Sequence, residues 1–396
     1  MVRLPRLRLT GEVNTMDWNL SEDHKIIKET VSKIAQKELA PKAAEIDKTA
    51  SFVWDGLKKL KEADVLGLAI PTEYEGMGMD TLSFVLAVEE IAKACGSTAL
   101  SFVSHAICSY IILCAGNEEQ RKKHLPSMAK GEKLGAFCVH ESNCGSNALA
   151  LETKAVLEKD EYVVNGSKIF ITNAQEAEIY AVLVRTDPTK GPQGISMLLI
   201  EKGTNGFSFG KQEEKMGLNG TSSCELFFQD CRVPKENLLG NEDEGLKIVA
   251  QAIIGFGFFG AAAISLGIAQ AALDASIKHA KERVIAGNPI GANQLMRALI
   301  TEMSLGVDTT RAFLYATASR RDVNPSGPIV DALKVKLYAS EAAIDVTDKA
   351  LQVHGGHGYC RDFPIERYYR DARGLTLHFK TTELLKADIG KMLIGI

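Results

Sequence analysis

The sequence predicts an α+β protein of several domains: a helical N-terminal part, a β-rich middle part and a helical C-terminal part. Apolar residues recur at helical spacing from residue 20 to about 131, short β-rich runs follow to about residue 230, and long helical patterns resume after Pro234. Because helices and strands occupy separate stretches, segregated modules are favoured over alternating βαβ units. No G-x-G-x-x-G follows a strand, so a doubly wound dinucleotide fold is not expected.

The composition is that of an ordinary globular protein. The chain has 396 residues, of which 46 are basic and 50 are acidic. Hydrophobic residues make up 45% of the chain and charged residues 24%. This excludes a disordered chain, and the balanced charge gives no basic footprint for nucleic acid. Eight cysteines are too dilute for a disulfide scaffold and form no CxxC pair, which favours reduced thiols in a cytoplasm-like compartment.

The first fifteen residues form a segment of their own. MVRLPRLRLTGEVNT carries Arg3, Arg6 and Arg8 with one acid, and it lacks the long apolar stretch of a secretory signal. We interpret residues 1–15 as a flexible extension of a cytoplasmic protein. If the arginines are the remnant of a transit peptide, the mitochondrial matrix is the alternative. The N-terminal helical domain is expected over residues 16–132, with runs such as IIKETVSKIAQKEL.

The middle β-domain is expected over residues 133–240. Its runs are GAFCVH, KAVLEKDEYVVNG, KIFITN, IYAVLVRTD, GISMLLIE and CELFFQD. Turn signals such as Asn165-Gly166 and Asp187-Pro188 are predicted to separate these strands.

The C-terminal helical domain is expected over residues 241–396. It contains a segment from Ile248 to Leu273 without a charged residue, which is long enough to cross a bilayer. Gln251, Ser265 and Gln270 interrupt this segment, and four glycines recur through it. A helix that is apolar all round is also what the centre of a large bundle requires, so we expect it to be buried and predict no membrane span.

Two stretches of the middle domain could bind a ligand. GAFCVHESNCGSNALA (135–150) leaves a strand in a loop of small residues, whose free N–H groups could cradle an anionic or heterocyclic ligand. A plain surface turn has the same composition. KIFITNA (168–174) places Phe170 and Thr172 on one face of a strand, as a stacking ring beside a hydroxyl donor, with core packing as the alternative.

The run QVHGGHGYCRDFPIERYYRDAR (352–373) is more specific. Gly355 and Gly356 allow another group to approach the backbone closely, which near a helix end suits a phosphate or diphosphate. The arginines and acids that follow are also what a solvated ion-pair face contains. A metal site at His354 and His357 is not expected, because residues three apart share a face only on a helix and paired glycines disfavour one.

Taken together, these motifs resemble the acyl-CoA dehydrogenase flavoprotein family. The resemblance extends from about Met16 to Ile396 and rests on the helix–β–helix order and on five motifs: FCVHESNCGS, KIFITN, KMGLNGTSSCELFFQDCRVP, the pair Glu282-Arg283 before Gly287, and QVHGGHGY followed by RYYRDAR. It implies a C-terminal four-helix bundle, non-covalently bound FAD and an acyl-CoA thioester substrate. It further implies a homotetramer that passes electrons to an electron-transfer flavoprotein.

The resemblance also implies which residues contact the cofactor. Val139 and His140 match the loop that faces the isoalloxazine ring, followed by Gly145 and Ser146, and Ser146 also matches a contact to the pantetheine arm of CoA. The remaining matched positions are Phe170 and Thr172, where the family usually has Trp and Ser or Thr; Arg283 and Gln294, which hold the cofactor of a neighbouring subunit; Gln352, Gly355 and Gly356 in the diphosphate-binding turn; and Thr381 with Glu383 as the last contact. Arginine suits a diphosphate because its fork gives two charge-assisted hydrogen bonds.

The sequence departs from the family at the position of the catalytic base. In most members, the Glu of a stretch of the type YEGTSEI removes the proton next to the thioester carbonyl. Here the stretch is HFKTTEL, so Phe379 replaces that Glu and Lys380 replaces the following Gly. Some relatives carry the base on the first helix of the C-terminal bundle, at the position of Gly257. The Asp and Arg that many relatives direct towards CoA are replaced by Gly255 and Phe258.

Loss of a positioned base predicts altered chemistry, because such a base contributes roughly 10²–10⁴ in rate, or about 3–5 kcal/mol of barrier. One interpretation is that the base has moved, with His105 and His378 as candidates, although histidines are more often packing residues. The substrate would then be an unusual acyl-CoA, such as a cyclic or conjugated one, lying against Phe379, with hydride passed to the flavin. His140 could bind the flavin and change its reduction potential.

Other interpretations remain open. A base-independent lyase would release carbon dioxide or sulfite, but the stretch GSTALSFVSH (96–105) has no arginine to hold the leaving group. A non-catalytic subunit would bind flavin or CoA without turnover. A monooxygenase of the same fold is disfavoured by the intact QVHGGHGY and RYYRDAR runs, although fold alone does not fix chemistry. We expect an FAD-dependent oxidoreductase that acts on CH–CH groups.

Overall fold

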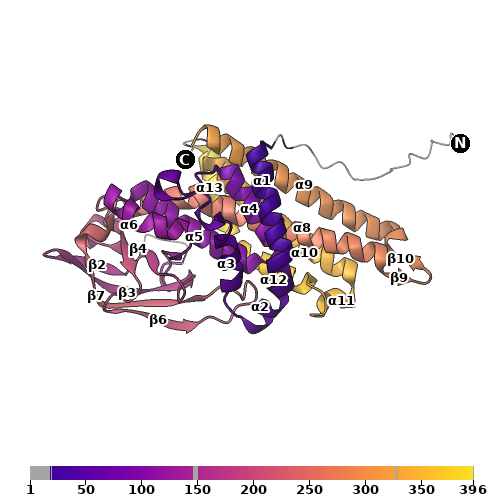
Figure 1. Cartoon of the computed structure of the whole chain (residues 1–396), viewed down its shortest axis with the longest axis horizontal. Helices are drawn as coiled ribbons and strands as arrows, with labels where there is room; N and C mark the ends of the chain where they lie inside the picture. The colour runs from indigo at the N-terminus through magenta and orange to yellow at the C-terminus, as the bar shows by residue number, and fades with distance from the viewer. Residues whose placement is uncertain (1–17, 19, 146–149, 326, 328, 396) are drawn as a thin grey trace.

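The computed structural model of the chain describes residues 18, 20–145, 150–325, 327 and 329–395. It confirms the predicted class, with helices before and after a central sheet (Figure 1). The expected extension 1–15 lies outside the described residues. The N-terminal helices are α1 (Glu22–Ile34), α2 (Ala43–Thr49), α3 (Trp54–Lys61), α4 (Thr81–Ala94), α5 (Gly96–Ala115) and α6 (Glu118–Ala129).

The middle of the chain forms one sheet, ordered β6-β7-β3-β2-β4-β5-β8, with β1 paired in parallel to β4. Its strands are β1 (Gly135–Cys138), β2 (Lys154–Glu158), β3 (Glu161–Thr172), β4 (Ile179–Arg185), β5 (Ile195–Glu201), β6 (Phe207–Gln212), β7 (Ser223–Pro234) and β8 (Leu238–Leu239). The sequence did not predict β6 or β8. These strands bury a small core of their own around Tyr180, whose hydroxyl oxygen lies 2.8 and 2.5 Å from the carbonyl oxygens of Ala174 and Ala177.

One predicted turn was wrong. Asn165-Gly166 does not end a strand, because β3 runs on to Thr172 through a register shift against β7. Gly166 adopts φ +147°, and a Cβ there would lie 2.6 Å from Thr153. The glycine therefore serves close backbone approach within a strand.

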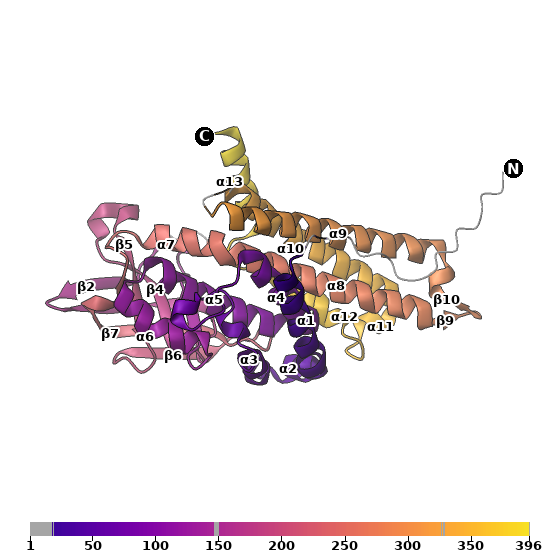
Figure 2. The ribbon, with the colours of Figure 1, turned by 45° about the horizontal axis from the view of Figure 1, so that its top comes forward.

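The C-terminal part is a bundle of long helices joined at one end by a small hairpin (Figure 2). Its elements are α7 (Gly245–Ala252), α8 (Phe258–Glu282), α9 (Gln294–Val323), α10 (Ile329–His354), α11 (Gly356–Tyr359), α12 (Ile365–Leu375) and α13 (Thr382–Ile394), with the hairpin strands β9 (Val284–Ile285) and β10 (Asn288–Pro289).

The uncharged segment of the sequence is the centre of this core. α7 and α8 form one helix, Gly245–Glu282, through a π-helical turn at Ile253–Gly257. Glycine lets its neighbours approach: a Cβ at Gly260 would lie 2.5 Å from Val103 of α5. By length and composition this helix and α5, which the sequence analysis did not single out, could both cross a membrane, and most of each apolar window is buried in protein.

Candidate active site

Phe379 lies in the turn between α12 and α13, against the π-helical turn of the α7–α8 helix. Its Cδ1 lies 3.4 Å from the position that a Cβ would take at Gly257. The backbone of Phe379 has φ +61°, a region that bulky residues rarely adopt. Residues 257 and 379, the two positions that the resemblance matched to a catalytic base, are therefore side by side, and neither has a carboxylate.

His378 brings an imidazole to the same turn. Its Nδ1 lies 2.7 Å from the carbonyl oxygen of Gly374, so Nδ1 carries the hydrogen and donates, and Nε2 is left as an acceptor. Burial lowers the pKa of His378, and the positive charges of Lys336 and Lys215 lower it further. The imidazole is therefore neutral near pH 7 and able to accept a proton.

Lys336 of α10 fixes the backbone of this turn. The sequence alone did not point to this residue. Its Nζ donates to the carbonyl oxygen of Lys380 at 2.7 Å and lies 3.5 Å from that of Thr376. The side chain is fully buried, and burial lowers its pKa to about 8. Two carbonyls flanking Phe379 and His378 are thus tied to one buried ammonium group.

The loop after β1 faces the same region. His140 is partly buried, and its carbonyl accepts a hydrogen bond from Ile169 of β3 at 2.9 Å. Burial lowers the pKa of His140, and the charge of Lys168, joined by that of His378 when His378 is protonated, acts in the same direction. His140 and His378 therefore lie within electrostatic range of each other.

A buried ion pair fixes this loop to the sheet. Lys168 is 0% exposed, and its Nζ donates to Oε1 of Glu141 at 2.6 Å. Glu141 also accepts from the backbone N–H groups of Glu152 and Thr153, at 2.6 and 3.1 Å. Burial opposes ionisation of Glu141, but Lys168 and these donors outweigh it and lower its pKa. Val139, whose carbonyl lies 3.5 Å from Lys168 Nζ, is positioned by the same lysine.

Phe170 and Thr172 lie at the end of β3. The ring of Phe170 is 63% exposed, and its backbone has φ +54° at an irregular point of the β3–β7 pairing. Thr172 is partly buried, and its carbonyl accepts from Ser104 of α5 at 3.5 Å. An exposed ring beside a hydroxyl offers a surface for a planar heterocycle.

The remaining positions expected in this region are placed as follows. Gly145 adopts φ +43°, and no described residue lies within 4 Å of where a Cβ would stand; Ser146 lies outside the described residues. Thr381 caps α13 and accepts from the N–H of Leu384 at 3.5 Å. Glu383 is in the first turn of that helix, exposed to solvent.

His105 lies apart from this group. It is 0% exposed, and its Nδ1 accepts a hydrogen bond from the N–H of Gly135 at 3.1 Å. Nε2 must then carry the hydrogen, and it has no hydrogen-bond partner among the described residues. Burial lowers the pKa of His105 to about 4. With its lone pair engaged, His105 is a poorer proton acceptor than His378.

A cavity of about 880 Å³ lies between the β9–β10 hairpin and α11. Arg283, Gln352, Gly355 and Gly356 line it, so four positions assigned to cofactor binding meet there. Gly355 adopts φ +58°, and a Cβ at either glycine would meet open space. Gln294 is exposed at the start of α9 and does not line this cavity.

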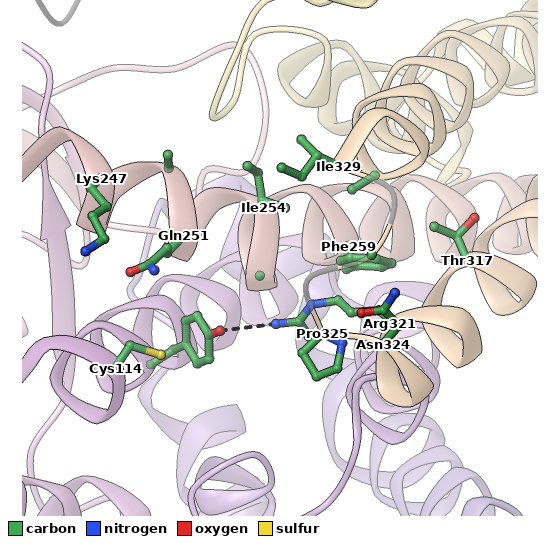
Figure 3. Close-up of a pocket in the computed structure, with 15 residues that line it drawn as sticks. Cys114, Lys247, Gln251, Ile254, Phe259, Thr317, Arg321, Asn324, Pro325 and Ile329 are labelled. Atoms are coloured by element: carbon green, nitrogen blue, oxygen red, sulfur yellow. Dashed lines mark hydrogen bonds between the residues drawn. The ribbon is translucent and has the colours of Figure 1, made fainter. Parts of the chain in front are cut away.

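Another cavity, of about 390 Å³, lies between α5, the α7–α8 helix and α9 (Figure 3). Arg321 of α9 projects into it and donates to the hydroxyls of Tyr110 and Thr81, at 3.3 and 2.6 Å. Its guanidinium carbon lies 5.4 Å from the ring of Phe256. Among the described residues, no carboxylate forms an ion pair with Arg321.

Gly255 makes this arrangement possible. A Cβ there would lie 2.7 Å from the ring of Tyr110 and 3.1 Å from Nη2 of Arg321. These two side chains therefore occupy the space that a side chain at residue 255 would need. Sequence reasoning missed Arg321, because only the fold brings α9 to this helix.

Comparison with known proteins identifies the family. The chain matches the models of the acyl-CoA dehydrogenase N-terminal domain at residues 21–132, the middle domain at 136–231 and the C-terminal domain at 243–394. It is 40% identical over 375 residues to the short-chain specific acyl-CoA dehydrogenase of Clostridium acetobutylicum, covering 94% of this chain and 98% of that protein. It is 36% identical over 388 residues to cyclohex-1-ene-1-carbonyl-CoA dehydrogenase of Syntrophus aciditrophicus, covering 98% and 93%.

Solved structures agree. A chain from work on the electron transferring flavoprotein of Acidaminococcus fermentans superposes with a TM-score of 0.92 at 40% identity, covering 96% of this chain and 99% of that one. An acyl-CoA dehydrogenase from Bacillus anthracis complexed with FAD gives 0.88 at 30% identity, covering 95% and 67%. The chain therefore belongs to the acyl-CoA dehydrogenase family of FAD-dependent oxidoreductases, which act on CH–CH bonds.

Proposed function

We propose that this chain oxidises an unusual acyl-CoA thioester, such as a cyclic or conjugated one, and passes hydride to FAD without the usual glutamate base. The contact between Phe379 and Gly257 carries this proposal, because an aromatic ring occupies the place where a carboxylate would accept the proton. The relative named cyclohex-1-ene-1-carbonyl-CoA dehydrogenase supports a cyclic acyl group. Phe379 would then pack against that group and favour a flat or cyclic substrate.

His378 is the proposed proton acceptor. Its Nδ1 hydrogen is held by Gly374, so Nε2 is the acceptor atom. Lys336 and Lys215 disfavour a second positive charge nearby, which keeps the imidazole neutral until it takes a proton from the substrate. A proton acceptor on this turn need not be aligned with the carbon next to the carbonyl, which suits an acyl group with an activated proton elsewhere.

FAD supplies the hydride acceptor of this chemistry. Its ring would lie against Val139, His140, Phe170 and Thr172, where an exposed aromatic face and a hydroxyl fit a planar heterocycle. Gly145, Ser146, Thr381 and Glu383 are further proposed contacts.

The diphosphate would lie at Arg283, Gln352, Gly355 and Gly356, with Gln294 at the edge. The hairpin and α11 stand at the opposite end of the molecule from the sheet that would hold the ring (Figures 1 and 2). One FAD would therefore bridge two copies of the chain, which supports an assembly of at least two copies, and we propose that this assembly is a homotetramer.

Arg321 is the proposed anchor of the CoA arm. It is a cation without an acidic partner among the described residues, and its cavity follows the face of the α7–α8 helix that carries Gly255. Loss of the Asp and Arg usual at Gly255 and Phe258 would leave Arg321 to bind this arm. We further propose a cytoplasmic enzyme whose electrons pass to an electron-transfer flavoprotein, in line with the A. fermentans structure.

The test is anaerobic incubation of the purified holoenzyme with a panel of acyl-CoA thioesters, followed by flavin absorbance. Bleaching by cyclic or conjugated thioesters, with butyryl-CoA at least about 10²-fold slower, is the expected result. Release of carbon dioxide or sulfite without bleaching would assign a lyase instead. Tight thioester binding with neither change would assign a non-catalytic subunit.

A further inference from the structure

We propose that His279, His354 and His357 form a proton-sensitive wall of the cavity at the hairpin, and that binding of the FAD diphosphate there is coupled to proton uptake by this wall. The inference rests on the proposed placement of the diphosphate in that cavity. It assigns a role to three side chains that no cofactor position above includes.

The three imidazoles come from three elements and meet in one cluster. His279 of α8 stacks on His354 at the end of α10, with ring centroids 4.2 Å apart and planes 19° from parallel. His357 of α11 lies 6.5 Å from His279. Phe363 closes the cluster, with its ring centroid 5.6 to 5.7 Å from each imidazole. All three histidines line the cavity of about 880 Å³.

The other charged groups around the cluster favour an anion. α8 contributes Arg283 to the lining, and the segment after α11 contributes Cys360. β10, the turn after it and the start of α9 contribute neutral side chains, from Asn288 to Met296. Among the described residues no acid lines the cavity, and the acid that acts on His279 is its neighbour Glu282.

Without an anion, His279 and His354 resist protonation. Burial lowers the pKa of His279, and His357 and Arg283 lower it further, against the smaller opposing effect of Glu282. Burial also lowers the pKa of His354, although its ring nitrogen Nδ1 lies 2.9 Å from the carbonyl of Ala350 and leaves Nε2 able to bind a proton. Two stacked imidazolium rings would repel each other at this distance.

A diphosphate in the cavity reverses this balance. Its negative charges offset the repulsion and raise the pKa of the imidazoles that face it. Because coupling between two binding events is reciprocal, each proton taken up must also tighten the hold on FAD. The affinity for FAD should therefore increase as the pH falls through and below about 6.5, the ordinary pKa of histidine.

The experiment measures the release of FAD from the holoenzyme by the rise in flavin fluorescence at pH 7.5, 6.5 and 5.5 and constant ionic strength. As the pH is lowered, the rate of FAD release from the wild type should fall, by up to about tenfold per pH unit for one proton taken up. The double variant His279→Phe, His357→Gln keeps the ring stack and should lose most of this slope. His24→Gln removes a histidine of α1 that does not line the cavity, and it should retain the wild-type slope.

A wild-type rate that does not fall with pH, or an unchanged slope in the double variant, would overturn the inference. Arg283→Gln separates this failure from that of the underlying placement. If that variant releases FAD faster at every pH while the slope is absent, the diphosphate binds there without proton uptake. If it holds FAD as the wild type does, the placement and the inference both fail.

Discussion

The ring of Phe379 packs on the bare backbone of Gly257, with Cδ1 3.4 Å from where a Cβ would stand. That distance is ordinary van der Waals contact, and residue 257 is helical, so a side chain could project from either residue into the same space. A side chain from the α7–α8 helix and one from the turn before α13 could thus reach the same position. Residues 257 and 379 are Gly and Phe, so neither places a carboxylate there.

Restoring the carboxylate at Phe379 should restore ordinary dehydrogenation. We expect Phe379→Glu to reduce its flavin with butyryl-CoA at least about 10²-fold faster than the wild type, because a positioned base is worth about 10²–10⁴ in rate. Anaerobic stopped-flow absorbance measures this rate. Phe379→Gln, with the same shape and no basic oxygen, is the control and should stay slow. A Glu variant that binds flavin and thioester normally yet remains inert would show that Phe379 does not occupy the position of the base.

His378 should be needed for turnover of the preferred substrate. His378→Gln keeps a polar side chain but removes the basic nitrogen, and we expect kcat to fall by about 10²–10⁴ with little change in KM. Since a base acts when deprotonated and burial lowers the pKa of His378, wild-type kcat should be level near pH 7 and fall only below about 6.5. The variant should lose this limb of the profile.

His105 provides the matched comparison. Because its Nδ1 is already bound to Gly135, His105→Ala should destabilise the helix packing and leave kcat and its pH profile unchanged. Equal turnover in both histidine variants and the wild type would remove both residues as bases.

The class of fold could be predicted because it depends on local sequence, and local motifs were also enough to propose candidate cofactor contacts. Helical and strand periodicities mark the three parts, and short motifs single out Phe170 and Gly355, which the structure leaves accessible, as candidate cofactor contacts. The turn at Asn165-Gly166 was wrong because the same dipeptide serves a hairpin or a close approach, and only the position of Thr153 decides between them.

The groups that tune the site could not be predicted, because each acts through a partner far away in the sequence. The role of Lys336 in fixing the turn depends on α10 lying against Lys380, whose carbonyl oxygen accepts its hydrogen bond. Arg321 enters its cavity only because Gly255 is opposite. The pairing of Lys168 could be predicted in part. A lysine at an inward position of a strand needs an acidic partner, but the sequence does not identify Glu141 as that partner.

Arg321 should contribute to thioester binding. Arg321→Gln removes the cation from its cavity, and we expect the Kd of acyl-CoA thioesters to rise about tenfold, which corresponds to one charge-assisted hydrogen bond of about 1.4 kcal/mol. Titration calorimetry with thioester and with free CoA measures the change, and a loss shared by both assigns Arg321 to the CoA arm. The control is Arg320→Gln, which removes the neighbouring arginine that pairs with Asp331 instead. Unchanged affinity in the Arg321 variant would exclude this role.

Lys336 should make stability depend on alkaline pH. Burial lowers its pKa from 10.5 to about 8, so between these values the unfolded chain binds the proton more tightly than the folded one. Folding stability should therefore rise with pH across that window, and Lys336→Met should abolish this part of the rise. The Tm of both proteins from pH 7.5 to 10 checks the prediction. Parallel Tm curves would show that Lys336 does not titrate as a buried lysine.

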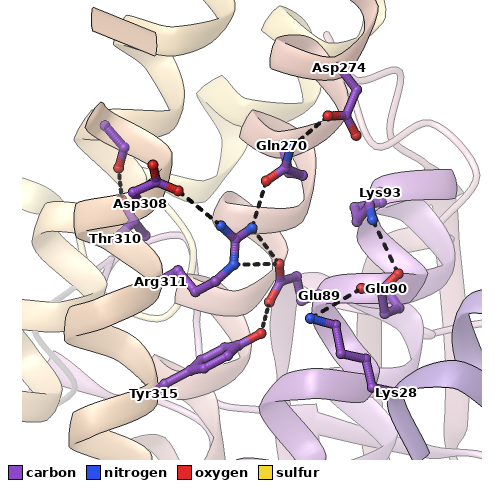
Figure 4. Close-up of polar contacts among 11 residues, drawn as sticks. Lys28, Glu89, Glu90, Lys93, Gln270, Asp274, Asp308, Thr310, Arg311 and Tyr315 are labelled. Atoms are coloured by element: carbon purple, nitrogen blue, oxygen red, sulfur yellow. Dashed lines mark hydrogen bonds and ion pairs between the residues drawn. The ribbon is translucent and has the colours of Figure 1, made fainter. Parts of the chain in front are cut away.

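Glu89 should be the most sensitive charged residue of the helical core. It is 1% exposed on α4, and its carboxylate accepts from Arg311 at 2.8 Å and from the hydroxyl of Tyr315 at 2.5 Å (Figure 4). Glu89→Gln removes the buried counter-ion of Arg311 and leaves the guanidinium with Asp308, a half-exposed carboxylate 3.5 Å away, and the neutral oxygen of Gln270. We expect a loss of up to about 3–5 kcal/mol, the range for broken buried pairs, because Asp308 retains part of the pairing.

The acid dependence follows from the same pair. Burial disfavours ionised Glu89, but Arg311 and Lys28 outweigh it and lower its pKa below 4.5. Its stabilisation is therefore fully present above pH 4.5 and is lost as the pH falls through the lowered value. The gap in Tm between wild type and Glu89→Gln should be widest near neutrality and narrow in acid. Glu22→Gln, at an exposed position of α1, should leave Tm unchanged, and an equally small effect at Glu89 would show that the carboxylate is not paired in the folded protein.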